Sequence, residues 1–134
     1  MNRVLVVDDE IRTCENLVKI LVKKGYSAFA AHNGVEALEF LNGHDVEVVL
    51  LDMRMPVMDG ITALKRIKED HPDTVAIMVT AISDKSVAED CIKAGAFSYL
   101  DKPINFQELF TEIGRALEHR GSMPPGDEIR HAYD

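Results

Sequence analysis

The sequence predicts a doubly wound α/β sandwich, in which helices cover both faces of a parallel five-stranded sheet with strand order 2-1-3-4-5. Three observations lead to this fold class. The chain has 134 residues, a length that suits one domain. Short apolar runs alternate with longer stretches whose apolar residues recur every three or four positions. The apolar runs are also unbroken, which is typical of strands that are covered on both faces.

The first half of the chain contains two strand and helix pairs. Residues 4–7 form a strand, and the helix that follows, 11–24, ends at Gly25. A weaker strand is predicted at 27–31. Asn33 then caps a helix that runs to about Leu41, with Glu36 as its capping-box partner. The inner face of the first helix is expected to carry Ile11, Cys14, Leu17, Val18 and Leu21.

The second half repeats this alternation. Strands are predicted at 46–51, 75–80 and 97–100. The helix between the first two of these strands is marked by Ile61, Leu64 and Ile67 and ends at 71–73. Ser83 or Asp84 caps the next helix, which ends at Gly95.

Asn105 caps the last helix, with Glu108 as its partner. The expected inner face of this helix consists of Phe106, Leu109, Phe110, Ile113 and Leu117. We therefore predict one domain over residues 1–120. Residues 121–134 lack periodicity and are predicted to be a linker or a frayed C-terminal tail.

Composition excludes several classes of protein. The formal net charge is −8, from 15 basic and 23 acidic residues, and no basic cluster is present, which argues against direct binding to nucleic acid or to anionic membranes. The longest apolar run has five residues, whereas a membrane-spanning helix needs about 20. The two cysteines are expected to be free thiols, so we expect a cytoplasmic location.

Polar side chains follow four of the predicted strands. Asp8 and Asp9 come after the first strand, Asp52 ends the third, Thr80 ends the fourth, and Lys102 follows the fifth. The carboxyl ends of parallel strands share one edge of a sheet, which is where such sheets bind ligands. With the predicted strand order, the three aspartates should lie within a few ångströms of one another.

Such crowding favours a bound cation. At about 5 Å and an effective dielectric constant of about 20, each pair of carboxylates costs about 3 kcal/mol. Either one carboxyl is therefore protonated at neutral pH, or a divalent cation is bound. Oxygen ligands suit Mg²⁺, with Mn²⁺ as an alternative. A metal ion, Lys102 and Thr80 around Asp52 would suit phosphoryl transfer with Asp52 as the nucleophile.

Four motifs make residues 2–120 resemble the receiver domain of bacterial two-component response regulators. They are Val-Val-Asp-Asp-Glu at 6–10, the stretch 50–60 that begins Leu-Leu-Asp-Met-Arg-Met-Pro, Val-Thr-Ala at 79–81, and Tyr-Leu-Asp-Lys-Pro at 99–103. The resemblance implies a flavodoxin-like sandwich and a role for individual residues. Asp52 matches the phosphoacceptor. Metal ligands would be Asp8, Asp9, Asp52 and the backbone carbonyl of Arg54, with Asp8 acting largely through water.

The resemblance also implies a switch. Thr80 and Lys102 would receive the phosphoryl oxygens, and Thr80 would gain a partner only in the phosphorylated state. Tyr99 matches an aromatic residue that turns inward when Thr80 moves. The Lys102–Pro103 peptide bond would be cis.

The function so implied is a phosphorylation-activated signalling switch. A sensor histidine kinase or a phosphotransfer protein would phosphorylate Asp52 in a Mg²⁺-dependent reaction, after docking near Ile11, Arg12 and Glu15. The surface of the fourth helix, fifth strand and fifth helix would then control an output domain or a downstream protein, with transcription as the expected output. The resemblance also allows a homodimer that forms on phosphorylation. No enzymatic activity is expected beyond the domain's own phosphorylation and dephosphorylation.

Three other classes of protein compete with this interpretation. A metal-dependent phosphatase with an aspartate nucleophile would need a second acid two residues later, where this chain has Arg54. A flavin-binding module would need a Ser-, Thr- and Gly-rich loop after the first strand, where this chain has residues 8–10, which are acidic. A degenerate receiver that binds partners without phosphorylation would not need Asp52, Thr80 and Lys102 together.

Overall fold

The computed structural model describes residues 2–81 and 84–121. It contains one sheet of five parallel strands in the order β2-β1-β3-β4-β5, as predicted. Along the chain the elements are β1 Arg3–Val7, α1 Ile11–Lys24, β2 Ser27–Ala31, α2 Gly34–Gly43, β3 Val48–Leu51, α3 Gly60–Asp70, β4 Val75–Thr80, α4 Lys85–Lys93, β5 Ser98–Asp101 and α5 Phe106–Gly121.

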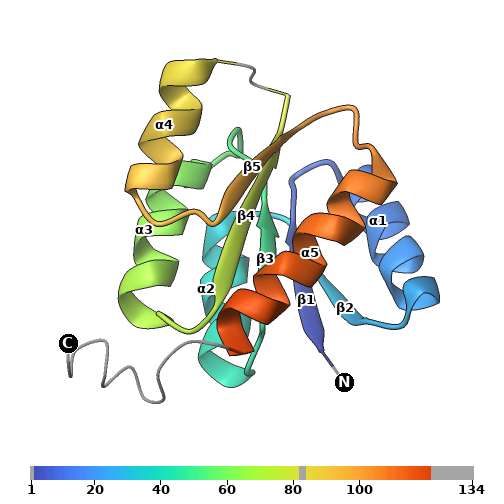
Figure 1. The fold of residues 1–134 in the computed structure, drawn as a ribbon. Coiled ribbons are helices and arrows are strands. Elements are labelled where there is room, and N and C mark those ends of the chain that lie inside the picture. Colours follow the sequence, from blue (N-terminus) through green and yellow to red (C-terminus); the bar gives the residue numbers. More distant parts are fainter. Residues whose placement is uncertain (1, 82–83, 122–134) are drawn as a thin grey trace.

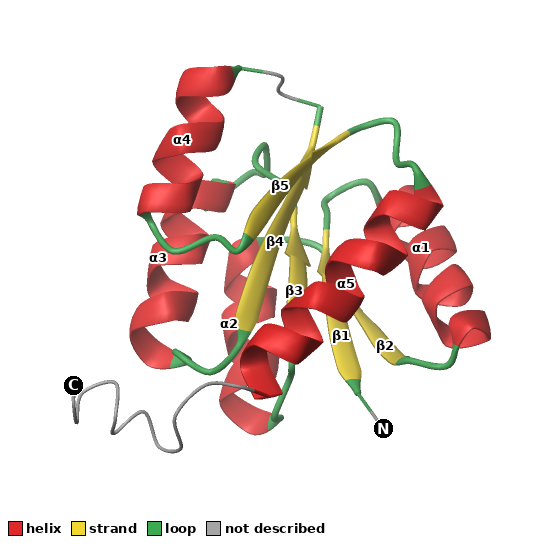
Figure 2. Ribbon diagram, in the orientation of Figure 1, coloured by secondary structure: helices red, strands yellow, loops and turns green. Residues whose placement is uncertain are grey.

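The helices form two layers around the sheet, with α1 and α5 on one face and α2, α3 and α4 on the other (Figures 1 and 2). Successive strand residues point to opposite faces. In β1, for example, Val4 and Val6 pack with α1 and α5, whereas Leu5 and Val7 pack with the other three helices. Both faces of each central strand are therefore buried, which explains their unbroken apolar sequences.

Backbone hydrogen bonds extend the ladder past the ends of the strands. The Asp8 N–H donates to the Ala31 carbonyl over 3.1 Å, and the Asp52 N–H donates to the Val7 carbonyl over 3.0 Å. The Lys102 N–H donates to the Thr80 carbonyl over 2.9 Å. These bonds fix the relative positions of the residues that follow the strands.

The predicted helix caps are confirmed. The Asn33 side chain accepts a hydrogen bond from the Glu36 N–H, although the Glu36 carboxylate accepts from the N–H of His32 rather than from that of Asn33. Asn105 caps α5 through the N–H of Glu108. Asp84 caps α4 through two backbone N–H groups, while the alternative cap, Ser83, lies outside the described residues.

Strand ends differ from the prediction by one or two residues. The strand predicted at 46–51 begins at Val48, and the carbonyl of buried Val46 accepts the Thr74 hydroxyl over 2.9 Å. The strand predicted at 97–100 spans 98–101, and β1 gains Arg3. The predicted tail at 121–134 lies outside the described residues except for Gly121, which ends α5. Among the residues that the structure describes, no helix has the length and apolarity that crossing a membrane requires.

Two residues predicted on inner helix faces are exposed. Ile11 is 56% exposed and Phe106 is 42% exposed. Each is the first residue of its helix, beside the sheet edge from which the loops emerge, so the helical periodicity continues there but the core does not. The inner face of α5 is formed instead by Leu109, Ile113 and Ala116, which are fully buried, with Phe110 and Leu117 partly buried beside them.

This difference in burial predicts different effects of truncation on α5. Leu109→Ala should lower the free energy of unfolding by about 2–5 kcal/mol, because it leaves a cavity in the core. Phe106→Ala should lower it by less than about 1 kcal/mol, because the ring is already partly in water. Urea unfolding of both variants would measure these values, and equal losses would contradict the assignment of the inner face.

Candidate functional site

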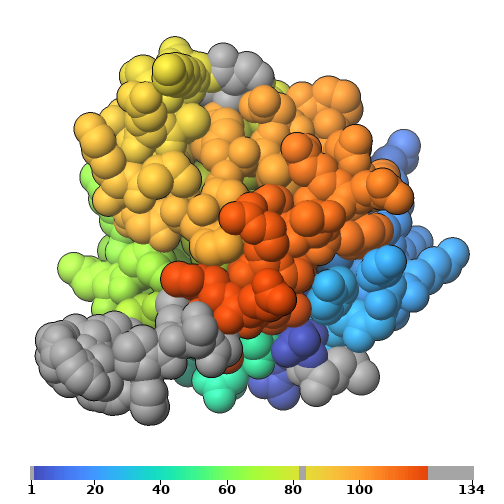
Figure 3. Space-filling model, viewed as in Figure 1, coloured from blue at the N-terminus to red at the C-terminus, as the bar shows by residue number. Residues whose placement is uncertain are grey.

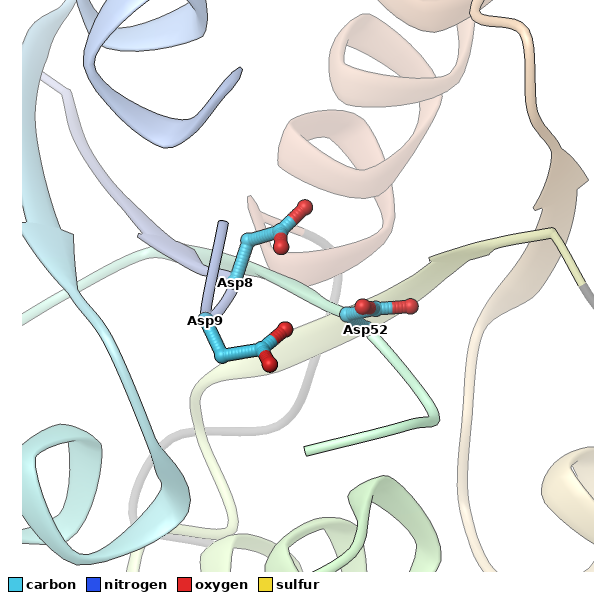
Figure 4. Close-up of side chains that lie close together, drawn as sticks. All are labelled: Asp8, Asp9 and Asp52. Carbon is cyan, nitrogen blue, oxygen red and sulfur yellow. The ribbon is translucent and has the colours of Figure 1, made fainter. Parts of the chain in front are cut away.

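Three aspartates meet at the sheet edge, as the sequence predicts. Asp8 and Asp9 follow β1, Asp52 follows the neighbouring strand β3, and their carboxylates face one another (Figure 4). One oxygen of each carboxylate lies within 4.8 Å of the others. Asp8 and Asp52 are buried, whereas Asp9 is exposed. In the part of the chain that the structure describes, this is the one group of acidic, histidine or cysteine side chains close enough to share a metal ion.

Lys102 reaches the cluster from the end of β5 and pairs mainly with Asp8. Its Nζ lies 2.7 Å from Oδ2 of Asp8 and 3.8 Å from Oδ2 of Asp52. The other Asp8 oxygen accepts the Glu10 N–H over 2.9 Å. Burial alone would lower the pKa of the Lys102 ammonium, but the hydrogen bond to Asp8 and the charge of Asp52 raise it above its usual value. Lys102 therefore stays charged in the site.

The surroundings of the Asp52 carboxyl shift its pKa. Its pKa is raised, chiefly because burial penalises the charged form; Lys102 opposes this shift and Asp8 adds to it. The Thr80 hydroxyl and the Met53 N–H, which donates to Oδ1 over 2.8 Å, also lower this pKa by hydrogen bonding. Because these effects on the Asp52 pKa oppose one another, a charge added nearby would change whether this carboxyl is protonated.

Thr80 differs from the expectation based on the sequence. It is the last residue of β4 and is fully buried, and its hydroxyl already hydrogen-bonds the Asp52 carboxyl. Asp52 is thus already a partner of Thr80 in the unphosphorylated protein, and the switch role of Thr80 stays a prediction.

The charges and the shape of the site suit one divalent cation. Three carboxylates and one ammonium leave two formal negative charges uncompensated. Beside them lies a cavity of about 490 Å³ lined by Asp9, Met53, Arg54, Met55 and Asp59. The donors that the three aspartates offer are carboxylate oxygens, which Mg²⁺ prefers. Arg54, one of the residues that line this cavity, is exposed.

Tyr99 lies outside the cluster. It is half-buried on β5 and lines a second cavity of about 210 Å³ together with Asp84, Lys85, Ala88 and Asp101. Burial, with a smaller contribution from Cys91, raises the pKa of its phenol. The structure thus brings together Asp8, Asp9, Asp52, Thr80 and Lys102, and it places Tyr99 on the neighbouring α4–β5 surface. The Lys102–Pro103 peptide bond is cis, as expected.

Gly60 is a part of the site that the sequence reasoning missed. A Cβ atom at this position would lie 2.3 Å from the Asp52 carbonyl oxygen and 2.6 Å from Cα of Met53. The Gly60 N–H also donates to the Met53 carbonyl over 2.7 Å. The start of α3 therefore packs directly on the backbone that carries Asp52. The Asp-Gly pair at 59–60 was a usable signal, since glycine permits close backbone approach.

Comparisons with known proteins point to one family. A family model, the response regulator receiver domain, matches residues 4–114. The transcriptional regulatory protein ZraR of Klebsiella oxytoca is 40% identical over 116 residues, which cover 87% of this chain and 26% of ZraR. The DNA-binding transcriptional regulator NtrC of Escherichia coli K12 is also 40% identical over 116 residues, covering 87% of this chain and 25% of NtrC. The chain thus spans about a quarter of the length of these relatives.

Solved structures of response regulator proteins are also similar to this chain. A CheY-like receiver domain from Methanospirillum hungatei superposes with a TM-score of 0.88 at 27% identity, covering 92% of this chain and 99% of that domain. The response regulator TrrA from Thermotoga maritima, solved with Mg²⁺ and BeF, has a TM-score of 0.80 at 35% identity, covering 87% of this chain and all of that one.

Close packing at Gly60 predicts a large difference between two glycine substitutions. Gly60→Ala should lower the free energy of unfolding by about 1–3 kcal/mol or more, because the new methyl group meets backbone that cannot move aside. Gly114→Ala in α5 is the matched control, since nothing lies within 4 Å of its added Cβ. That control should gain up to about 1 kcal/mol from helix propensity. Denaturant unfolding would compare the two variants, and equal changes in their free energies of unfolding would contradict the close packing at Gly60.

The raised pKa of Asp52 predicts that neutralising this residue stabilises the metal-free protein. The folded protein binds this proton more tightly than the unfolded chain does, so ionisation of Asp52 destabilises the fold above the raised pKa. Asp52→Asn should therefore raise the free energy of unfolding at pH 7 by about 1–2 kcal/mol. The gain should shrink as the pH falls through the raised pKa toward the ordinary value of 3.8, because the wild-type carboxyl is then neutral too. Unfolding in EDTA at several pH values would test this, and a gain independent of pH would contradict it.

Proposed function

Because the chain belongs to the family of response regulator receiver domains, we propose that it is a phosphorylation switch whose phosphoacceptor is Asp52. One observation carries this proposal: carboxylates from β1 and β3 converge with the Thr80 hydroxyl and the Lys102 ammonium at one edge of the sheet. A nucleophile, a metal site and two donors for anionic oxygens are the parts that phosphoryl transfer needs.

The reaction that we propose is transfer from a phosphorylated imidazole. A carboxylate oxygen of Asp52 forms a bond to phosphorus while the phosphorus–nitrogen bond breaks. The electron pair of that bond leaves with the imidazole nitrogen, and the phosphoryl group becomes an acyl phosphate on Asp52. Lys102 and Thr80 would donate hydrogen bonds to the phosphoryl oxygens, where negative charge gathers in the transition state. Each would give up a present partner, Asp8 and Asp52 respectively.

In this proposal Asp9 and Asp52 would hold the metal ion directly, Asp8 would hold it largely through water, and the Arg54 carbonyl would complete the protein ligands. Bound Mg²⁺ would neutralise the negative charge that otherwise repels a phosphoryl group from three carboxylates. The oxygen donor set would accept Mn²⁺ in the same way. Glu10 and Lys102 hold Asp8 in place for this role through hydrogen bonds of 2.9 and 2.7 Å.

Thr80 would couple the phosphoryl group to the rest of the domain. Its hydroxyl now bonds Asp52, and a phosphoryl oxygen offers a more highly charged acceptor nearby. Movement of Thr80 would shift the start of the β4–α4 loop and change the space available to Tyr99. The surface affected is formed by α4, β5 and α5, which lie together on one face of the molecule (Figure 3). Ligand-dependent contacts of this kind shift an existing equilibrium between conformations.

Partners follow from the same proposal. A sensor histidine kinase or phosphotransfer protein would dock near Ile11, Arg12 and Glu15, which are exposed at the start of α1 beside the acidic site. An output domain, a downstream protein or a second phosphorylated copy would read the α4–β5–α5 surface. Control of transcription is supported by the names of the relatives ZraR and NtrC. The exchange would take place in the cytoplasm, which suits the free thiols of Cys14 and Cys91.

Acetyl phosphate with Mg²⁺ provides a direct test. Intact-mass spectrometry should detect one added phosphoryl group on the wild-type protein and none on Asp52→Asn, because the acceptor oxygen is lost. Asp45→Asn is the control, since this exposed carboxylate lies at the opposite edge of the sheet and its loss should leave the added mass unchanged.

The same experiment distinguishes the competing functions. Addition that persists in Asp52→Asn would contradict the assignment of the phosphoacceptor. Continuous release of phosphate over many turnovers, without accumulation of the modified protein, would instead indicate a phosphatase.

A further inference from the structure

The loop between β3 and α3 contains a strained residue. Val57 has a φ of +72° and is the one non-glycine residue with a positive φ among those described. The Met58 N–H donates to the Pro56 carbonyl over 2.7 Å, so a γ-turn is closed around Val57. A β-branched residue is a marked outlier in this region of backbone conformation.

Packing of the Val57 side chain does not offset this strain. The side chain is 84% exposed, the largest value among the exposed large hydrophobic residues described. Burial of an aliphatic group would normally stabilise the backbone that positions it, and here almost none is buried. Val57 therefore disfavours the observed conformation of the loop relative to conformations in which its φ is negative.

The two ends of the loop are held firmly. At one end, the Met53 carbonyl accepts a hydrogen bond from the Gly60 N–H, and the Met53 N–H donates one to the Asp52 carboxylate. At the other end, the Asp59 carboxylate caps α3 through the Thr62 N–H over 2.9 Å, and the Met58 side chain packs against Gly34. The strain is consequently confined to the tip, between fixed ends.

This loop also forms a wall of the cavity beside the aspartates, since Met53, Arg54, Met55 and Asp59 all line it. The conformation in which Val57 is strained is thus the one that shapes the cavity. A ligand that needs this wall must bind a conformation that the sequence at position 57 disfavours.

We propose that Val57 is a positioning residue that weakens divalent-cation binding, because its strain disfavours the conformation of the 54–59 loop that shapes the cavity. The inference rests on the proposed function, in which the Arg54 carbonyl is a metal ligand. The apparent dissociation constant of a ligand rises as the population of its binding-competent conformation falls. Removing the strain should therefore tighten Mg²⁺ binding without any change to a ligand residue.

Three substitutions at this exposed position separate backbone strain from side-chain effects. Val57→Asn should tighten Mg²⁺ binding about three- to tenfold, because asparagine tolerates a positive φ. Val57→Gly should tighten it less, because glycine also gives more freedom to the relaxed loop. Val57→Ile is the matched control: it keeps the β-branched side chain and should leave the affinity unchanged. Calorimetric titration of metal-free protein with MgCl₂ measures all three affinities.

Hydrogen exchange in the metal-free protein gives a second readout, in which the amides of residues 54–59 should exchange more slowly in Val57→Asn than in the wild type. An unchanged Mg²⁺ affinity with a higher melting temperature would overturn the inference, because the strain would then matter only in unfolding. Equal tightening by Val57→Asn and Val57→Ile would also overturn it. Failure of the wild-type protein to bind Mg²⁺ at all would overturn the proposed function as well.

Discussion

Repulsion between like charges is the constraint on which the rest of this structure depends. Three carboxylates are held with oxygens within 4.8 Å of one another, two of them buried. Such an arrangement persists only because the backbone leaves no alternative: the ladder of the parallel sheet continues through the N–H groups of Asp8 and Asp52. The hydrophobic layers on both faces supply the energy that holds the strands in this register. The core thus serves the site by fixing where strand ends meet.

The single ammonium of Lys102 is placed to relieve this repulsion only in part. It forms a short bond with Asp8 and lies farther from Asp52, which keeps a raised pKa. Full neutralisation would need a second source of positive charge, and the adjacent open cavity leaves room for one. The electrostatics that make the fold less stable at neutral pH are therefore the same electrostatics that create affinity for a cation and, through it, for an anionic group.

The sequence predicted those features that follow from the order of strands and from the residues at their ends. Alternation of apolar runs and helical periodicities was enough to place Asp8, Asp9, Asp52, Thr80 and Lys102 together. It could not give the exposure of Ile11 and Phe106, because periodicity records the face of a helix and not where the core ends.

The sequence pattern also could not predict features that depend on the distance between two backbone segments or on a backbone dihedral angle. Gly60 matters through its distance from the Asp52 backbone, and Val57 through a dihedral angle that the tight loop imposes. Neither quantity is a property of residue type or spacing alone.

The bond already made by the Thr80 hydroxyl has a consequence for how sharply such a domain can respond. If the hydroxyl had no acceptor at rest, capturing one would release the whole energy of a new interaction. In the proposed switch the hydroxyl exchanges one acceptor for another, so only the difference in free energy between the two hydrogen bonds would favour the switched conformation. A small free-energy difference leaves both conformations populated. A docked protein that binds one of them more tightly can then shift the equilibrium as effectively as the chemical modification itself.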